Sequence, residues 1–166
     1  MRGVLQRCCG ASRRKLVSFG TRHTISYTVS DVYEIGAARR WIKGEVDRCA
    51  DASEGRMQVA FDSDLQDTTP RFSRPTEIVN VVATIFGTQT ESRDRIYVVS
   101  GHYDSRNSTS SDSIGEAPGA NDDASGTAAA MDMACVMSKY KFNVTLVFMA
   151  VAGAQQGLYG ATPWAE

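Results

Sequence analysis

Residues 95–123 read RIYVVSGHYDSRNSTSSDSIGEAPGANDD, and the expected fold is organised around this stretch. Its apolar run RIYVVS predicts a strand, and His102 and Asp104 stand where that strand is expected to end. Asp122 and Asp123 follow a Gly-rich loop and stand where a helix is expected to begin. Imidazole nitrogen and carboxylate oxygen are zinc ligands, and a strand end and a turn can aim them inward together. The stretch therefore predicts a metal site at one edge of a sheet.

The same residue types also fit a purely structural role. A His-x-Asp pair at the end of a strand is common in surface turns. Asn-Asp-Asp ahead of a helix is typical of a cap, because carboxylates accept the free backbone N–H groups of the first turn and favour the positive end of the helix dipole. The residues alone leave two alternatives open: a metal site, or a metal-independent α/β binding module in which these aspartates only cap a helix.

The segments that follow predict a strand-helix-strand crossover. Residues 125–139 favour a helix with a broad apolar side, and residues 144–151 form the longest apolar run, as expected of a strand covered on both faces. Such a crossover is normally right-handed and joins parallel strands, whose carboxyl ends are where ligands gather. The turn AGAQQG at residues 152–157 is therefore expected beside His102.

Upstream of this unit, the sequence predicts one helix and two strands. The helix begins after a cap at Ser30 or Asp31, and residues 57–61 and 77–86 favour strands by their alternation and β-branched content. His23 is interpreted as a surface or turn residue. The helix places these apolar side chains on one face: Ile35, Ala38, Ile42, Val46 and Cys49.

The bulk composition is that of one soluble globular domain with a hydrophobic core. The chain has 166 residues, 42% of them hydrophobic, and a formal net charge of -1, which suggests no nucleic-acid partner. Residues 1–17 are basic and are expected to be poorly ordered, whereas residues 18–166 are expected to form the domain. No export signal and no run of the roughly 18 apolar residues of a membrane span is visible. We therefore expect no membrane partner, and the cellular location stays open.

The cysteines and two Asn-x-Ser/Thr patterns indicate no function in the sequence. Cys8, Cys9, Cys49 and Cys135 show no metal-binding spacing and are interpreted as free thiols. Residues 107–109 and 143–145 match the Asn-x-Ser/Thr pattern of N-glycosylation. Because no export signal accompanies them, both are interpreted as chance matches.

Three blocks carry a resemblance to a known family. VSGHYDSR, APGANDDASGTAA and VFMAVAGAQQGLYGA, in this order and spacing, resemble the central blocks of the two-zinc aminopeptidases, peptidase family 28 of the metallopeptidases. The resemblance covers about residues 18–166. It implies an α/β fold with a mixed, largely parallel sheet flanked by helices, two zinc ions and a peptide substrate. Members of the family are often exported.

The resemblance also implies roles for individual residues. In the family, the His of the first block binds zinc, the Asp two residues on orients that His, and the first Asp of NDD bridges both metals; these roles map onto His102, Asp104 and Asp122. The third block departs from the pattern. Ala154 stands where the family has its general-base Glu, and Gln155 stands where it has a Glu that binds zinc.

These departures set the functional expectation. The family hydrolyses N-terminal residues from peptides, and its remaining Asp and His ligands lie in sequence beyond Glu166. We therefore expect an apparently truncated domain with impaired or absent activity, in which Asp123 or Glu116 are the carboxylates left to replace the base. The alternative is a non-catalytic relic or binding module of the same fold. A sheet cut after residues 144–151 is expected to leave that strand as an exposed edge, through which association is possible.

Overall fold

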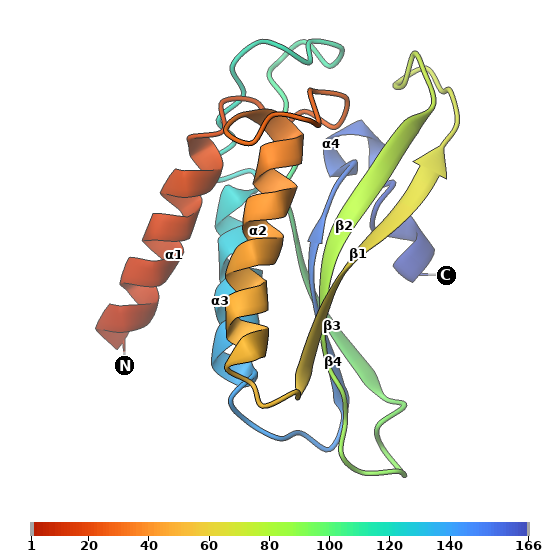
Figure 1. Cartoon of the computed structure of the whole chain (residues 1–166). Helices are drawn as coiled ribbons and strands as arrows, with labels where there is room; N and C mark the ends of the chain where they lie inside the picture. The colour runs from red at the N-terminus through yellow and green to blue at the C-terminus, as the bar shows by residue number, and fades with distance from the viewer. Residues whose placement is uncertain (1, 166) are drawn as a thin grey trace.

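The computed structural model describes residues 2–165, with side chains from Gly10 onward, and is built on one four-stranded sheet (Figure 1). Its strands occur in the spatial order β1-β2-β4-β3. Their bounds are β1 (Met57–Gln66), β2 (Thr76–Ile85), β3 (Ile96–His102) and β4 (Thr145–Val151). β1 and β4 each pair with β2 in antiparallel fashion, whereas β3 and β4 are parallel. The expected α/β fold with one mixed sheet is confirmed, but the sheet is not largely parallel, because only one of its three strand pairs is parallel.

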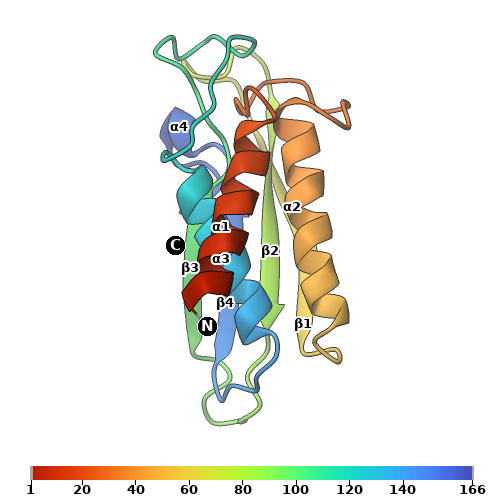
Figure 2. The same ribbon diagram turned by 90° about the vertical axis from the view of Figure 1, so that its left-hand side faces the viewer.

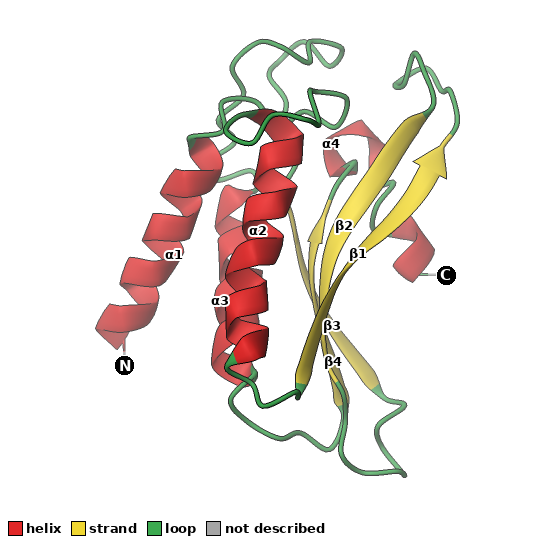
Figure 3. Cartoon of the chain, viewed as in Figure 1, coloured by secondary structure: helices red, strands yellow, loops and turns green. Residues whose placement is uncertain are grey.

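Three long helices cover one face of this sheet, and short helical turns follow β4 on the other side (Figure 3). α2 and α3 pack on the strands, and α1 lies outside them against α3 (Figure 2). The bounds are α1 (Arg2–Val17), α2 (Glu34–Asp51), α3 (Ala124–Met137), α4 (Ala154–Gly157) and the 3-10 turn η1 (Thr162–Trp164). None of the helices in the described part of the chain is long and apolar enough to cross a membrane.

β4 lies in the middle of the sheet, which corrects the expectation that this last strand is left as an edge. All seven of its residues are buried, as its continuous apolar run requires. The crossover from β3 through α3 returns the chain between β3 and β2, so that His102 pairs with Val151 at one border and Val81 pairs with Ala150 at the other. The edges of the described sheet are therefore β1 and β3.

The core fills the space between the sheet and the helices. α2 buries Ile35, Ala38, Ile42 and Val46, which confirms the predicted apolar face. The helix begins at Glu34 and not after Ser30, because the Ser30 hydroxyl accepts hydrogen bonds from the backbone N–H groups of Val32 and Tyr33 and closes a turn there.

α3 begins unusually close to the end of β3, and Gly101 makes this approach possible. A Cβ atom at residue 101 would lie 2.3 Å from the backbone nitrogen of Thr127 and 2.4 Å from the carbonyl carbon of Gly126. No side chain fits in that space. The glycine that precedes His102 therefore sets the distance between the strand end and the start of the helix.

Residues 2–17 of the basic segment form α1 in the structure, where the sequence predicts little order. The C-terminal end of α1 is tied to the domain by Leu16, which is fully buried, and by Phe19 just beyond it. The centroid of the Phe19 ring lies 6.1 Å from that of the Trp41 ring of α2, and the Lys15 ammonium lies over the Phe19 ring, 4.5 Å from its centroid. These apolar anchors carry no helical period in sequence, because they stand at the junction with a loop.

Cys49 and Cys135 form a disulfide that joins α2 to α3, which corrects their interpretation as free thiols. They are 86 positions apart in sequence, and their Cα atoms lie 5.1 Å apart. Only the packing of two helices on the same sheet face brings them together, so spacing along the chain gives no signal. The side chains of Cys8 and Cys9 lie outside the described residues.

We expect Cys49→Ala combined with Cys135→Ala to lower the free energy of unfolding by about 2–4 kcal/mol, because the cross-link restricts the unfolded chain over a long loop. Urea denaturation in non-reducing buffer measures the loss. The matched control is the unsubstituted protein in reductant, which should lose a similar amount. Equal urea midpoints for the unsubstituted protein and the double variant, both without reductant, would contradict a closed disulfide.

Candidate metal centre

The imidazole of His102 stands at the end of β3 and is held at both ring nitrogens by residues predicted for the site. Its Nε2 lies 2.9 Å from Oδ1 of Asp122, and its Nδ1 lies 3.1 Å from the backbone oxygen and 3.4 Å from Oδ1 of Asp104. Burial acts to lower the pKa of His102, but the hydrogen bond and negative charge of Asp104 outweigh it and raise the pKa to about 9. A metal needs the neutral ring, so a metal and a proton compete for Nε2.

The carboxylate of Asp104 is fully buried and ties the two halves of the site together. It accepts hydrogen bonds from the backbone N–H groups of Ala154 at 3.3 Å and Gln155 at 3.0 Å. The hydroxyl of Thr24 donates a third hydrogen bond at 3.2 Å. The turn that follows β4 therefore lies beside His102, as the crossover geometry predicts.

The two aspartates of the NDD motif have different contacts. Asp123 caps α3, because its carboxylate accepts a hydrogen bond from the backbone N–H of Gly126 at 2.8 Å and a second from the backbone N–H of His102 at 3.1 Å. Asp122 is largely exposed and turns its carboxylate to the His102 ring. The cap and the metal-site interpretations of this motif therefore apply to different residues.

Gln155 closes the cluster from the side of α4. Its Nε2 donates to Oδ2 of Asp122 at 2.9 Å, and its Oε1 accepts from the guanidinium of Arg106 at 3.0 Å. Ala154, which precedes it, is half-buried and offers only a methyl group. The structure thus brings together the six residues singled out for the site, whereas Glu116 is exposed in the loop ahead of α3. The six are His102, Asp104, Asp122, Asp123, Ala154 and Gln155.

A buried polar network adjoins this cluster, and the sequence analysis did not predict it. His23 is fully buried, which corrects its interpretation as a surface residue. Its Nε2 lies 2.9 Å from the side-chain amide of Gln156 and 3.0 Å from the backbone oxygen of Ser110. The Thr24 hydroxyl reaches both Gln156 and Asp104. These partners come from three distant parts of the chain, so no local sequence pattern predicts the contacts.

Arg22 is the largest fully buried side chain of this network. Burial lowers the pKa of Arg22 to about 10, although the negative charges of Asp104 and Asp123 act to raise it. The guanidinium thus joins the end of β3 to the loop that carries Asp122. It donates hydrogen bonds to four backbone oxygens, those of Leu16, Tyr103, Pro118 and Gly119.

The described residues fit only part of a zinc site. A catalytic zinc normally takes three protein ligands. His102 and Asp122 supply two donors, and Gln155 directs its amide nitrogen, which cannot bind a metal, toward Asp122. Among the side chains that the structure describes, from residue 10 to residue 165, no group of three or more His, Cys, Asp or Glu is placed to hold one metal ion.

Fold and site together define an α/β domain of the metallopeptidase type. The model of peptidase family M28 matches residues 80–166, and the chain belongs to this family. A "probable zinc metalloprotease" of Leptosphaeria maculans is 53% identical over 147 residues, which cover 89% of this chain and 34% of the relative. One from Pyricularia oryzae is 48% identical over 152 residues, which cover 92% of this chain and 30% of the relative. The chain thus spans about a third of the length of these curated relatives.

Solved structures share the fold at low sequence identity. A Zn-dependent exopeptidase from Parabacteroides distasonis aligns with a TM-score of 0.64 at 14% identity, over 89% of this chain and 46% of that one. The LapA aminopeptidase of Legionella pneumophila aligns with a TM-score of 0.62 at 21% identity, over 95% and 38%. A glutaminyl cyclase of Porphyromonas gingivalis aligns with a TM-score of 0.65 at 16% identity, over 95% and 48%. At these identities the likeness shows the fold alone.

We expect Arg22→Met to lower the free energy of unfolding by about 3–5 kcal/mol, because it leaves four backbone oxygens without their donor and removes a positive charge near the buried Asp104 carboxylate. Arg22→Lys keeps the charge but loses the forked geometry, so an intermediate loss is expected. Urea unfolding measures both variants. The matched control is Arg93→Met, whose side chain is exposed, and its effect should stay within about 0.5 kcal/mol. An Arg22→Met variant as stable as this control would contradict the role given to Arg22.

Proposed function

We propose that this chain carries part of an aminopeptidase-type zinc site, directed at the free N-terminus of a peptide, in which hydrolysis is lost or strongly impaired. One contact carries the proposal. The side-chain amide of Gln155 donates a hydrogen bond to Asp122 at 2.9 Å. A hydrogen-bond donor thus stands where the resemblance places an anionic metal ligand, and it engages the carboxylate assigned to bridge the metals.

The position of Ala154 supports the same proposal. Its backbone N–H is bonded to Asp104, so residue 154 lies at the rim of the site, where the resemblance places the general base. A methyl group accepts no proton, and a positioned general base typically contributes ~10²–10⁴-fold to the rate. The loss of this group alone is therefore enough to impair hydrolysis strongly.

The neighbouring carboxylates are poorly suited to replace this base. Asp123 already accepts hydrogen bonds from the backbone N–H groups of Gly126 and His102, one on each carboxylate oxygen, so both oxygens are engaged in capping α3 and holding the end of β3. Glu116 is exposed in a loop and is not tied to the site by any hydrogen bond among the described residues. We therefore assign the base to neither of them.

Zinc retention is expected to be weak. After purification and dialysis against a chelator, the chain should hold fewer than one zinc ion, because the described residues supply two donors where three are needed. Gln155→Glu should raise the retained zinc by adding a carboxylate, and His102→Ala should lower it. Elemental analysis measures all three proteins. Two tightly held zinc ions in the unsubstituted chain would overturn the proposal.

Hydrolysis is tested with an aminoacyl-anilide substrate and added zinc. The unsubstituted chain and His102→Ala should release the anilide at the same background rate. Ala154→Glu alone should restore nothing measurable, because the ligand position at 155 is still an amide. Activity is expected only when Ala154→Glu and Gln155→Glu are combined and the chain is joined to the C-terminal part of an active relative.

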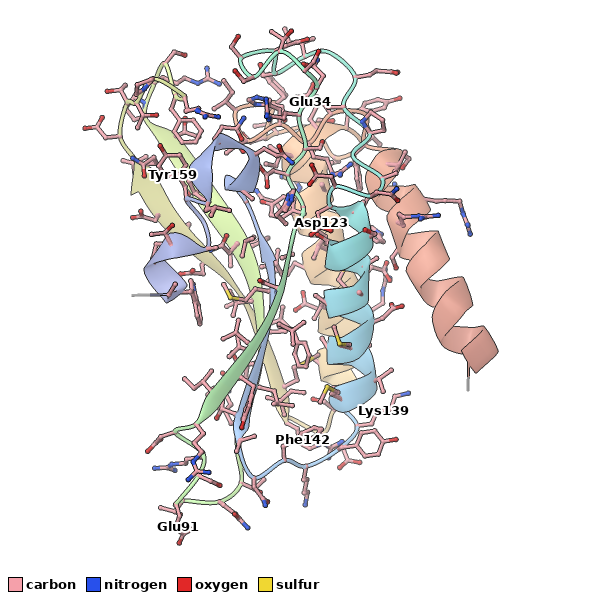
Figure 4. The ribbon with its side chains drawn as sticks, turned by 180° about the vertical axis from the view of Figure 1, so that it is seen from behind. Glu34, Glu91, Asp123, Lys139, Phe142 and Tyr159 are labelled. Atoms are coloured by element: carbon pink, nitrogen blue, oxygen red, sulfur yellow. A yellow bond between two sulfur atoms is a disulfide. The ribbon has the colours of Figure 1, made fainter. Side chains whose placement is uncertain are left out.

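One result of this assay would contradict the proposal. Turnover by the unsubstituted chain that disappears in His102→Ala would show that another group has become the base. Asp123→Asn and Glu116→Gln then identify it, with Glu91→Gln, far from the site in Figure 4, as the matched control.

A further inference from the structure

The disulfide between α2 and α3 indicates that this chain folds under oxidising conditions. Cys49 and Cys135 are joined in the structure. Disulfides persist in oxidising compartments and are rare where glutathione and thioredoxin keep thiols reduced. The cross-link is therefore typical of a chain that matures in a secretory compartment. In that compartment, an Asn-x-Ser/Thr pattern on the surface is a candidate for glycosylation. The two patterns interpreted above as chance matches are therefore considered again.

The pattern at residues 143–145 lies in the loop that joins α3 to β4. Asn143 is exposed, and its side-chain amide has no hydrogen-bond partner among the described residues. Only its backbone oxygen is engaged, by the hydroxyl of Ser92 at 3.0 Å. The amide nitrogen is therefore free to carry a substituent without the loss of a contact in the folded protein.

This loop lies at the opposite end of the molecule from the site. Phe142, the residue before Asn143, is at the far end of the sheet from Asp123 in Figure 4. A bulky, hydrophilic group attached to this exposed loop would extend into solvent and would leave the site accessible. Position and exposure thus agree with what a surface glycan requires.

We propose that Asn143 is an N-glycosylation site of this chain. The donor is a lipid-linked oligosaccharide activated as its pyrophosphate. A bond forms between Nδ2 of Asn143 and the anomeric carbon of the first sugar, and the bond between that carbon and the pyrophosphate oxygen breaks. The amide proton leaves with the lipid pyrophosphate, and no atom changes its oxidation state.

The second matching pattern, at residues 107–109, differs in its contacts. Nδ2 of Asn107 donates to the carboxylate of Asp112 at 2.7 Å, and its Oδ1 accepts from the backbone N–H of Thr109 at 2.9 Å. Both ends of this amide hold the loop together, and the residue is half-buried. Asn107 therefore serves as the matched control.

The test is expression of the chain behind a heterologous leader in a eukaryotic secretory host. Intact mass is measured before and after treatment with peptide-N-glycosidase, and the peptide that contains residue 143 is mapped for the Asn-to-Asp conversion that this enzyme leaves. We expect the secreted chain to lose a glycan mass and to show the conversion at Asn143. Asn143→Gln should abolish the modification of that peptide, and Asn107→Gln should leave it unchanged.

A second variant guards against effects on folding. The Thr145 hydroxyl donates to the backbone oxygen of Arg93 at 2.7 Å, so its removal disturbs the structure as well as the pattern. Thr145→Ser keeps both the hydroxyl and the pattern and should keep the glycan. A secreted chain with a closed Cys49–Cys135 disulfide and an unmodified Asn143 would overturn the proposal.

Discussion

The buried carboxylate of Asp104 holds together the segments that meet at the candidate site. A charge removed from water is tolerated only when hydrogen bonds and an opposite charge compensate for it. Asp104 obtains its hydrogen bonds from Thr24 and from the first N–H groups of α4, with Arg22 as the nearby positive charge. These groups come from the loop before α2 and the turn after β4, and Asp104 itself follows the end of β3. The need to satisfy one carboxylate therefore fixes the relative positions of three segments.

This arrangement separates the scaffold of the site from its reactive groups. The scaffold contacts use backbone N–H groups at residues 154 and 155, which are present whatever side chains stand there. The turn can therefore keep its shape while Ala154 and Gln155 replace the acidic residues that the family resemblance leads one to expect. Gln155 even adds contacts of its own, to Asp122 and Arg106. Under our proposal, the fold of this family is retained here while the chemistry of its site is lost or impaired.

The two ends of the sheet have different roles in this picture. The carboxyl ends of the parallel pair β3 and β4 gather the polar cluster, which is where such sheets place their ligands. The loop that enters β4 at the other end is exposed and is where we place the glycan. The disulfide between α2 and α3 restrains the helical layer behind the sheet. Membership in a zinc metallopeptidase family and maturation under oxidising conditions are thus argued from separate parts of the molecule.

Local sequence patterns were enough to predict the strands, the crossover from β3 to β4 and the approach of residues 152–157 to His102, because each rests on a local pattern of apolar residues or on the handedness of one connection. Together with the family resemblance, they also singled out the residues of the cluster. The packing in three dimensions was needed to show that β4 is central, that His23 and Arg22 are buried, that Cys49 meets Cys135, and that Asp123 caps while Asp122 faces the imidazole. The burial of His23 and Arg22 and the disulfide depend on partners more than 80 positions away, such as Tyr103 for Arg22 and Gln156 for His23, and local periodicity carries no information about such partners.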